Sequence, residues 1–460
     1  MLFSGIPFLY YFLPCTLILY FLSPTKLKNT TLLIASLIFY AWGEPKYVFL
    51  MAITILVGYV FGILIEKYRA TKRAKVYLFI SAFLSLISLL YFKYADFFIE
   101  NFALVTGLSV KILGLALPIG ISFYTFQIIS YSVDVYRGDV AQKNPVNLAA
   151  YVTMFSQLIA GPIVRYRDIA EQLESRKHSV EGAAFGIRRF ILGLAKKILI
   201  ANQLGELCAI FRGSDEKSVL FYWLYAVSFC LHIYFDFSGY SDMAIGLGKI
   251  FAFDFIENFN YPYISKSVAE FWRRWHISLG SWFRDYVYIP LGGNKVRFSR
   301  WIFNILVVWM LTGFWHGASW NFIIWGLYFA VLLIAEKLFL SKLLSKSKII
   351  ANIYVLFAVL ISFVIFNASD MGEALSDIGG LFGVGASGLT SAEALYMLKS
   401  YSLVIFFGII GATPLPKYIV SKINIKVRNS LEVPILALLL IIMTAFLVDG
   451  SFNPFLYFRF

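Results

Sequence analysis

The stretch TGFWHGASWNF, residues 312–322, places a histidine between two tryptophans inside an apolar run. An imidazole titrates near neutral pH, so the ring of His316 suits general acid or base chemistry. Ionisable residues at membrane depth are rare and usually face a bundle interior or a water-filled cavity. His316 is therefore either a catalytic base or a neutral histidine that bonds to a neighbouring carbonyl and serves packing.

A second polar cluster lies in residues 271–294, FWRRWHISLGSWFRDYVYIPLGGN. His276 stands there beside Arg273 and Arg274, and Arg284 follows. Guanidinium forks suit phosphate groups, so these arginines could form a cationic mouth for a phosphate-bearing donor. The mixture of Trp, Arg and Tyr also fits a helix at the membrane surface whose arginines extend to water. Composition alone favours the surface helix.

Two carboxylates interrupt the apolar background of residues 232–248, HIYFDFSGYSDMAIGLG. Asp236 and Asp242 need partners at this depth. They could pair with the arginines of the later segment, or orient a histidine through a hydrogen bond. We expect a structural hydrogen-bonding role rather than direct catalysis.

The other candidate residues carry weaker signals. Tyr457 lies among phenylalanines in the terminal DGSFNPFLYFRF, where an aromatic anchor at the membrane interface is the simplest interpretation. We expect His178, in the polar run ESRKHSVEG, to be a solvated loop residue. Cys15, Cys208 and Cys230 are scattered in apolar surroundings, and we expect neither a disulfide framework nor a metal site from them.

The composition determines which elements must position these residues. Hydrophobic residues make up 60% of the 460, and charged residues only 14%, against about 25% in soluble chains. Unbroken apolar runs such as VPILALLLIIMTAFLV exclude the short alternating strands of a membrane β-barrel. The sequence therefore predicts an all-α polytopic membrane protein. Its net charge of +14 lies in short loops between spans and is not a nucleic-acid signature.

We expect about eleven transmembrane helices, and the shorter stretches 118–134, 148–163 and 271–290 as re-entrant or interfacial helices. No repeat or long linker divides the chain, so residues 1–460 should form one membrane domain. Its expected parts are N-terminal spans, a catalytic core and C-terminal spans with the tail, over residues 1–117, 118–330 and 331–460. The eleven spans are expected near residues 6–23, 30–42, 46–65, 76–99, 184–211, 218–235, 301–316, 319–339, 349–366, 400–413 and 432–448.

Loop charges predict the orientation of these spans. Residues 66–75, EKYRATKRAK, carry five basic side chains against one acid, and residues 337–348 and 417–428 carry four basic side chains each. Basic loops stay in the cytoplasm. Residues 367–398 hold four acids and neither Lys nor Arg, so we place them outside. Counted from the nearest basic loop, with three expected spans before residues 66–75 and one after residues 417–428, both termini lie outside, so the total number of spans must be even, one more or one fewer than eleven.

Taken together, several stretches resemble the membrane-bound O-acyltransferase family, and within it the bacterial alginate O-acetyltransferase-like branch. The resemblance covers most of the chain from about residue 118 onward, and the pair of RRWHIS and WHGASW is its most specific part. The stretches are GISFYTFQIISYSVDVYRG, FSQLIAGPIVRY, IYFDFSGYSDMAIGLG, ENFNYPYISKSVAEFWRRWHISLGSWFRDYVYIPLGGN and LTGFWHGASWNFIIWG.

The resemblance implies a ring of membrane helices around a central tunnel in the inner membrane of a bacterium. In that family the histidine that His316 matches is catalytic, and His276 matches a second polar residue of the active site. The tail resembles an F-x-Y-x-x-F pattern, Phe455, Tyr457 and Phe460 here, whose tyrosine is thought to relay the acyl group outward.

The expected reaction moves an acetyl group from cytoplasmic acetyl-CoA to a hydroxyl, with His316 as general base and Arg273, Arg274 and Arg284 near the donor phosphates. The acceptor would be Tyr457 or a hydroxyl of an extracytoplasmic SGNH/esterase-like acetyltransferase that serves an exported alginate-like or peptidoglycan-like polysaccharide. We expect no bound cofactor, no metal and no nucleic acid.

Three alternatives remain open on the sequence. A transporter or flippase would use His and Asp as a proton relay, although the paired repeats common in such folds are not visible. A related acyltransferase would take its acyl group from a carrier protein instead of CoA. A catalytically silent scaffold fits poorly, because it gives His316 and His276 no reason to lie where they do.

Overall fold

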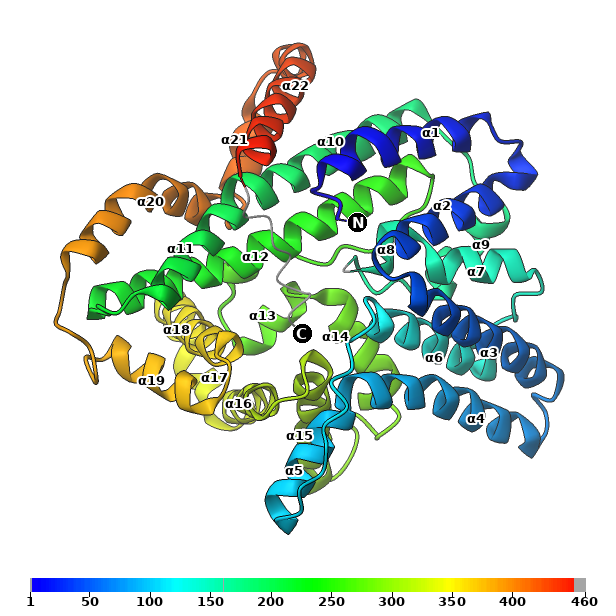
Figure 1. Cartoon of the computed structure of the whole chain (residues 1–460), viewed down its shortest axis with the longest axis horizontal. Coiled ribbons are helices and arrows are strands. Elements are labelled where there is room, and N and C mark those ends of the chain that lie inside the picture. The colour runs from blue at the N-terminus through cyan, green and yellow to red at the C-terminus, as the bar shows by residue number, and fades with distance from the viewer. Residues whose placement is uncertain (1, 160, 451–460) are drawn as a thin grey trace. The chain divides into compact units, whose positions relative to one another are not determined.

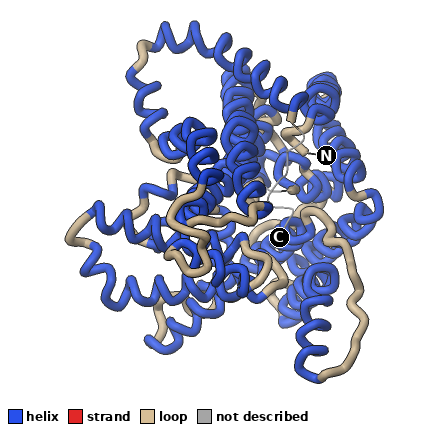
Figure 2. Tube along the Cα trace, turned by 60° about the vertical axis from the view of Figure 1, so that its left-hand side comes forward, coloured by secondary structure: helices blue, strands red, loops and turns tan. Residues whose placement is uncertain are grey.

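Helices and loops make up the computed structural model, which describes residues 2–159 and 161–450, and no strand occurs in these two ranges (Figures 1 and 2). This confirms the all-α prediction. Apolar helices satisfy every backbone hydrogen bond within the segment, which is the requirement that a bilayer imposes. The described chain divides into two compact units, residues 1–190 with 243–256, and residues 191–242 with 257–460. The prediction of one membrane domain stays a prediction.

The first unit contains ten α-helices in its described residues, the last of them in part, in addition to the end of α12 (Val219–Ile250). They are α1 (Leu13–Leu22), α2 (Lys28–Gly43), α3 (Val48–Lys67), α4 (Lys72–Leu89), α5 (Ala95–Thr106), α6 (Ile121–Arg137), α7 (Pro145–Thr153), α8 (Phe155–Leu158), α9 (Tyr166–Glu174) and α10 (Val180–Ala195), of which α10 ends in the second unit.

The second unit begins within α10 and contains most of the residues singled out above. Its described helices are α11 (Asn202–Gly213), α12 (Val219–Ile250), α13 (Val268–Arg274), α14 (Ile277–Phe283), α15 (Phe298–His316), α16 (Trp320–Ala335), α17 (Ser341–Leu344), α18 (Lys348–Asn367), α19 (Met371–Leu381), α20 (Ala392–Gly411), α21 (Leu415–Lys422) and α22 (Ile425–Asp449). The last eight residues of α12 return to the first unit.

Eight helices in the described part of the chain are long and apolar enough to cross a membrane, which confirms a multi-pass protein. The other expected spans coincide with shorter or more polar helices: Phe8–Leu22, the 16-residue α2, and α10 to α11, which carries two lysines in its middle. The eight are Pro45–Lys67, Lys72–Thr106, Val219–Ile250, Phe298–His316, Trp320–Leu344, Lys348–Asn367, Ala392–Gly411 and Ile425–Asp449.

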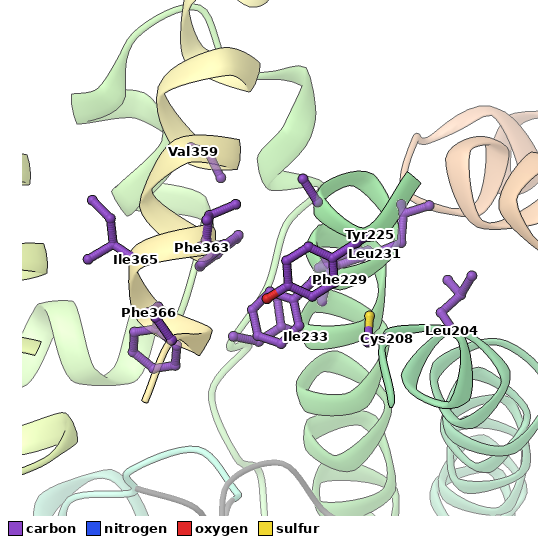
Figure 3. Packing of buried hydrophobic residues seen from close by; sticks show 14 of the residues in the cluster. Leu204, Cys208, Tyr225, Phe229, Leu231, Ile233, Val359, Phe363, Ile365 and Phe366 are labelled. Atoms are coloured by element: carbon purple, nitrogen blue, oxygen red, sulfur yellow. The ribbon is translucent and has the colours of Figure 1, made fainter. Parts of the chain in front are cut away.

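The hydrophobic core of the second unit forms around α12. Within its most apolar window 78% of the residues are buried, against 6% for α22, so α12 is an internal helix whereas α22 leaves its apolar surface for lipid. Aromatic side chains such as Phe229 on α12 and Phe363 on α18 are buried in this core, with Leu204 and Cys208 from α11 (Figure 3). The face of α18 that packs in the core also carries Phe366.

Two glycines let α15 and α16 pack backbone against backbone. A Cβ added to Gly313 would overlap the carbonyl oxygen of Phe322, and one added to Gly326 would overlap that of Trp309. Small residues at membrane helix interfaces permit such close approach, and van der Waals packing then stabilises the pair. The side-chain amide of Asn321 donates to the Ala368 carbonyl at 2.8 Å, which fastens the start of α16 to the end of α18.

We predict that Gly326→Ala destabilises the fold by about 1–3 kcal/mol, because the new methyl group must push α15 and α16 apart. The measurement is the melting temperature of the purified protein in detergent. Gly213→Ala is the matched control, since a Cβ there meets no atom within 4 Å. Equal melting temperatures for the two variants would contradict the close-packing interpretation.

Candidate active site

His316 is the last residue of α15. The helix ends there because Gly317 is extended, with φ −168° and ψ 154°, and α16 begins only at Trp320. The side chain is 8% exposed. The Gly-Ala-Ser break noted in the sequence is therefore a reversal between two packed helices, and it puts the imidazole at a helix end.

Aromatic rings surround His316. Its ring lies 5.0 Å from that of Trp315, 5.1 Å from that of Trp325 and 5.2 Å from that of Phe366, all centroid to centroid and all edge to face. Edge-to-face contacts at this distance are favourable and fix the plane of the ring. Three helices, α15, α16 and α18, thus hold the orientation of this imidazole.

His276 lies in the same aromatic cluster. It is 2% exposed, its ring centroid is 4.6 Å from that of Phe237, and 6.2 Å from that of Trp315. The indole of Trp315 therefore contacts both histidines that the sequence singled out. His276 immediately precedes α14 and has φ 44° and ψ 54°, a left-handed conformation that is uncommon for residues other than glycine. Strained backbone of this kind is concentrated at functional sites.

Asn258 orients His276. Its side-chain oxygen accepts hydrogen bonds from the Ser278 amide at 3.2 Å and the Ser278 hydroxyl at 2.9 Å, and it lies 3.1 Å from Nδ1 of His276. An amide N–H only donates, so the Asn258 atom that faces it is the oxygen, and Nδ1 of His276 must carry the proton. The Asn258 amide nitrogen donates to the Ser241 hydroxyl at 3.1 Å, which fixes the same orientation.

This tautomer leaves Nε2 of His276 as a hydrogen-bond acceptor. Nε2 is buried and has no hydrogen-bond partner in the part of the chain that the structure describes. Burial lowers the pKa of His276 to about 3. The ring is therefore neutral at physiological pH, with its basic nitrogen within the aromatic cluster.

The two carboxylates of α12 pair with lysines that the sequence analysis did not name. Asp236 lies 2.6 Å from the ammonium of Lys197, and both side chains are 2% exposed. Asp242 lies 2.6 Å from the ammonium of Lys196, and this second pair is more exposed, at 18% and 31%. Both lysines begin η5 (Lys196–Ala201), a π-helical segment between α10 and α11. The ion pairs bind α12 to this segment, which fits the structural role expected for the carboxylates.

The three arginines proposed for donor binding have different surroundings. Arg274 pairs with Glu270 at 2.9 Å and donates to the Asn260 carbonyl at 3.0 Å, and Arg284 pairs with Asp285 at 2.7 Å. Arg273 is exposed and forms no ion pair within 4.0 Å in the described residues, although its charge interacts with the Glu336 carboxylate at longer range. Arg273 is therefore the cation of this set that is best placed to meet an outside anion.

Glu336 holds α13, the helix that carries Arg273 and Arg274. Its carboxylate accepts hydrogen bonds from the backbone amides of Val268 at 2.5 Å and Ala269 at 3.1 Å, at the amino terminus of α13. A carboxylate at this position satisfies amides that have no partner inside the helix and interacts favourably with the helix dipole. Tyr457, the remaining candidate, lies outside the described residues.

Comparison with known proteins identifies the family. The model of MBOAT, the membrane-bound O-acyltransferase family, matches residues 34–368. The chain belongs to this family. It is similar over its whole length to a probable alginate O-acetylase, AlgI, of Azotobacter vinelandii, with 38% identity and 100% of both chains covered. It is also similar to the peptidoglycan O-acetyltransferase of Helicobacter pylori, with 32% identity over 100% of this chain and 98% of that protein.

A more distant relative covers about half the chain. The teichoic acid D-alanyltransferase of Bacillus subtilis is 31% identical over 48% of this chain and 59% of its own. The matched family makes this protein a multi-pass O-acyltransferase of the bacterial inner membrane. Membership favours the enzyme over the transporter or flippase that the sequence left open.

Sequence reasoning missed Asn258, Ser278, Lys197 and Glu336 in this membrane-bound O-acyltransferase. A signal was present for the lysine, because Lys196 and Lys197 interrupt an apolar stretch and such charges need partners. Glu336 interrupts the apolar run of residues 320–340 in the same way, but nothing in the sequence marks its partner, since Val268 lies 68 residues away.

We predict that Lys197→Met destabilises the protein by about 3–5 kcal/mol, because it leaves the Asp236 carboxylate buried without its cation. The double variant Lys197→Met/Asp236→Leu should lose less stability, since neither charge of the ion pair then remains buried without its partner. Lys196→Met, at the more exposed pair, is the control and should cost at most about 1 kcal/mol. Melting temperatures in detergent measure all three, and a double variant no more stable than Lys197→Met would refute this account.

Proposed function

We propose that this enzyme transfers an acetyl group from cytoplasmic acetyl-CoA for the O-acetylation of an exported polysaccharide. The observation that carries the proposal is the pair of buried histidines, His316 and His276, in contact with one indole in a chain of the membrane-bound O-acyltransferase family. Relatives named for alginate and peptidoglycan acetylation support a polysaccharide as final acceptor.

The proposed chemistry is one acyl transfer. The acceptor hydroxyl oxygen attacks the thioester carbonyl while a ring nitrogen of His316 takes the hydroxyl proton. A C–O bond forms, the C–S bond breaks, and the proton passes to the departing thiolate, so the products are an acetyl ester and free coenzyme A. Acid–base assistance of this kind contributes about 10² to 10⁴ in rate.

His276 would orient the acceptor. Its Nδ1–H is engaged by Asn258, so the bare Nε2 can accept a hydrogen bond from the incoming hydroxyl and hold it in the site before the hydroxyl proton turns to His316. In this proposal Asn258 is a positioning residue, because it fixes the tautomer without touching the reacting atoms. Holding two reactants in one geometry lowers the barrier even when no proton moves through His276.

The donor side relies on Arg273. Its exposed guanidinium forms no ion pair within 4.0 Å among the described residues and interacts with the Glu336 carboxylate only at longer range, whereas Arg274 and Arg284 each have an ion-pair partner. We therefore propose Arg273 as the main contact to a donor phosphate, with the other two arginines holding the local fold. A carrier-protein thioester is the competing donor.

On the outer side the acetyl group would pass to Tyr457, and from there to an extracytoplasmic SGNH/esterase-like acetyltransferase. Two sequence features support this relay: the terminal tyrosine within FLYFRF, and the orientation from loop charges that puts the carboxyl end outside.

We predict that His316→Ala, present in membranes at the normal level, lowers acetyl transfer from labelled acetyl-CoA by about 10²- to 10⁴-fold. Cys15→Ala, an exposed position on α1, is the control and should keep full activity. The same assay with an acetylated carrier protein in place of acetyl-CoA tests the competing donor. Full polymer acetylation by His316→Ala would rule out its role as base.

We also predict an acetyl adduct on Tyr457 during turnover, because the relay requires a covalent ester on its phenolic oxygen. Mass spectrometry of the carboxyl-terminal peptide, with and without acetyl-CoA, measures this mass increase. Tyr457→Phe should abolish both the adduct and polymer acetylation, whereas Phe458→Tyr should leave them unchanged. An unmodified tail under trapping conditions would remove the relay but not the role of His316.

A further inference from the structure

A group of basic side chains in the first unit is not used by the proposed reaction. It consists of Lys28 at the start of α2, and Arg176 and His178 in the loop between α9 and α10, and all three surround Tyr20 near the end of α1. We call these four residues the basic cluster. Lys28, Arg176 and His178 are half-buried, so each is both held in place and accessible.

Tyr20 is the centre of the basic cluster. Its hydroxyl oxygen accepts hydrogen bonds from Nε of Arg176 at 3.1 Å and from a terminal nitrogen at 3.0 Å. The hydroxyl lies 2.8 Å from Nε2 of His178, against 3.4 Å from the Phe251 carbonyl, so its own proton is best given to the imidazole. His178 then carries its proton on Nδ1, which stays a donor. The expectation of a merely solvated loop histidine is too simple.

Arg176 is fixed by neutral groups. Its other terminal nitrogen donates to the Asn29 side-chain oxygen at 2.7 Å and to the Gln172 carbonyl at 3.1 Å. These bonds and the two to Tyr20 use four of its five N–H donors, and one remains for a ligand. The guanidinium also lies 4.4 Å from the ring centroid of Phe253, an uncharged partner.

No acid compensates the charge of the basic cluster. Lys28 lies 4.9 Å from the ring centroid of Tyr20, and no carboxylate of the described residues lies within ion-pair distance of Lys28 or Arg176. The acid on the nearby loop, Asp254, is bonded to Lys249 and Gln172. Burial lowers the pKa of His178, and the charges of Lys28 and Arg176 lower it further, so the neighbours repel additional positive charge.

Two half-buried arginines of the second unit differ from this arrangement. Arg212 has Glu373 and Asp377 at 2.7 Å each, and Arg274 has Glu270. Keeping two cations together without an acid costs free energy, unless an anion from outside supplies the missing charge.

We propose that the basic cluster binds the phosphate group of a ligand at the cytoplasmic face. One N–H of Arg176, the ammonium of Lys28 and Nδ1–H of His178 are the donors available to it. We expect this side from loop charge, because the turn from α1 to α2 and the basic residues 66–75 are separated by the two spans expected from the sequence near residues 30–42 and 46–65. The phosphate belongs either to an anionic phospholipid headgroup or to coenzyme A, and the experiment separates these sources.

The test measures binding by the full-length protein in detergent, with short-chain phosphatidylglycerol and coenzyme A as separate probes. Lys28→Gln and Arg176→Gln should each weaken binding of at least one probe about tenfold, the loss expected when a charge-assisted contact disappears. Lys26→Gln is the matched control, because Lys26 is an exposed lysine of the same turn. Weaker binding of phosphatidylglycerol alone identifies a lipid site, and weaker binding of coenzyme A alone identifies a donor site.

Stability without ligand distinguishes a binding role from a structural one. The Lys28 side chain makes no hydrogen bond or ion pair with the described residues, so Lys28→Gln should leave the melting temperature unchanged or raise it, while the stabilisation by the bound probe disappears. Unchanged affinity for both probes in Lys28→Gln and Arg176→Gln, relative to Lys26→Gln, would overturn the proposal. The proposal would also be overturned if Lys28→Gln had a lower melting temperature and neither probe changed that temperature.

Discussion

The close approach of α15 to α16 is the constraint on which the position of His316 depends. Two glycine contacts bring the helices together, and the extended residue Gly317 ends α15 at the histidine. The imidazole therefore lies at a reversal, where α16 and α18 can supply Trp325 and Phe366 to enclose it. A histidine in the middle of a continuous span would meet only the residues that its own helix face allows.

Three polar contacts in the second unit follow a common pattern, in which a side chain obtains its partner from another segment of the chain. Glu336 caps α13, Asn258 holds His276, and Lys197 neutralises Asp236. Unsatisfied polar groups are expensive away from water, so each of these contacts also fixes the segment that bears it. The network makes irregular chain possible between α12 and α15, which is where the second histidine lies.

The sequence predicted the fold class and the two histidines because these depend on local signals. Apolar runs define spans, and a histidine within such a run is conspicuous. The ion-pair partners of Asp236 and Asp242 were harder to predict, because two lysines and several arginines were all chemically suitable. Only tertiary packing selects among them. Asn258 was missed because an asparagine in a polar loop carries no signal of what it binds. The left-handed backbone of His276 was equally invisible, since it results from the pairing of two distant loops.

The π-helical segment η5 has a consequence for how this chain can change during evolution. A π turn holds one residue more than an α turn, so η5 already holds more than a regular α-helix would. Inserting a further residue there would rotate everything before it by about 100° relative to α11. Both lysines would then leave the carboxylates of α12 together. Insertions in residues 196–201 should therefore be far less tolerated than substitutions, even though no reacting atom lies in the segment.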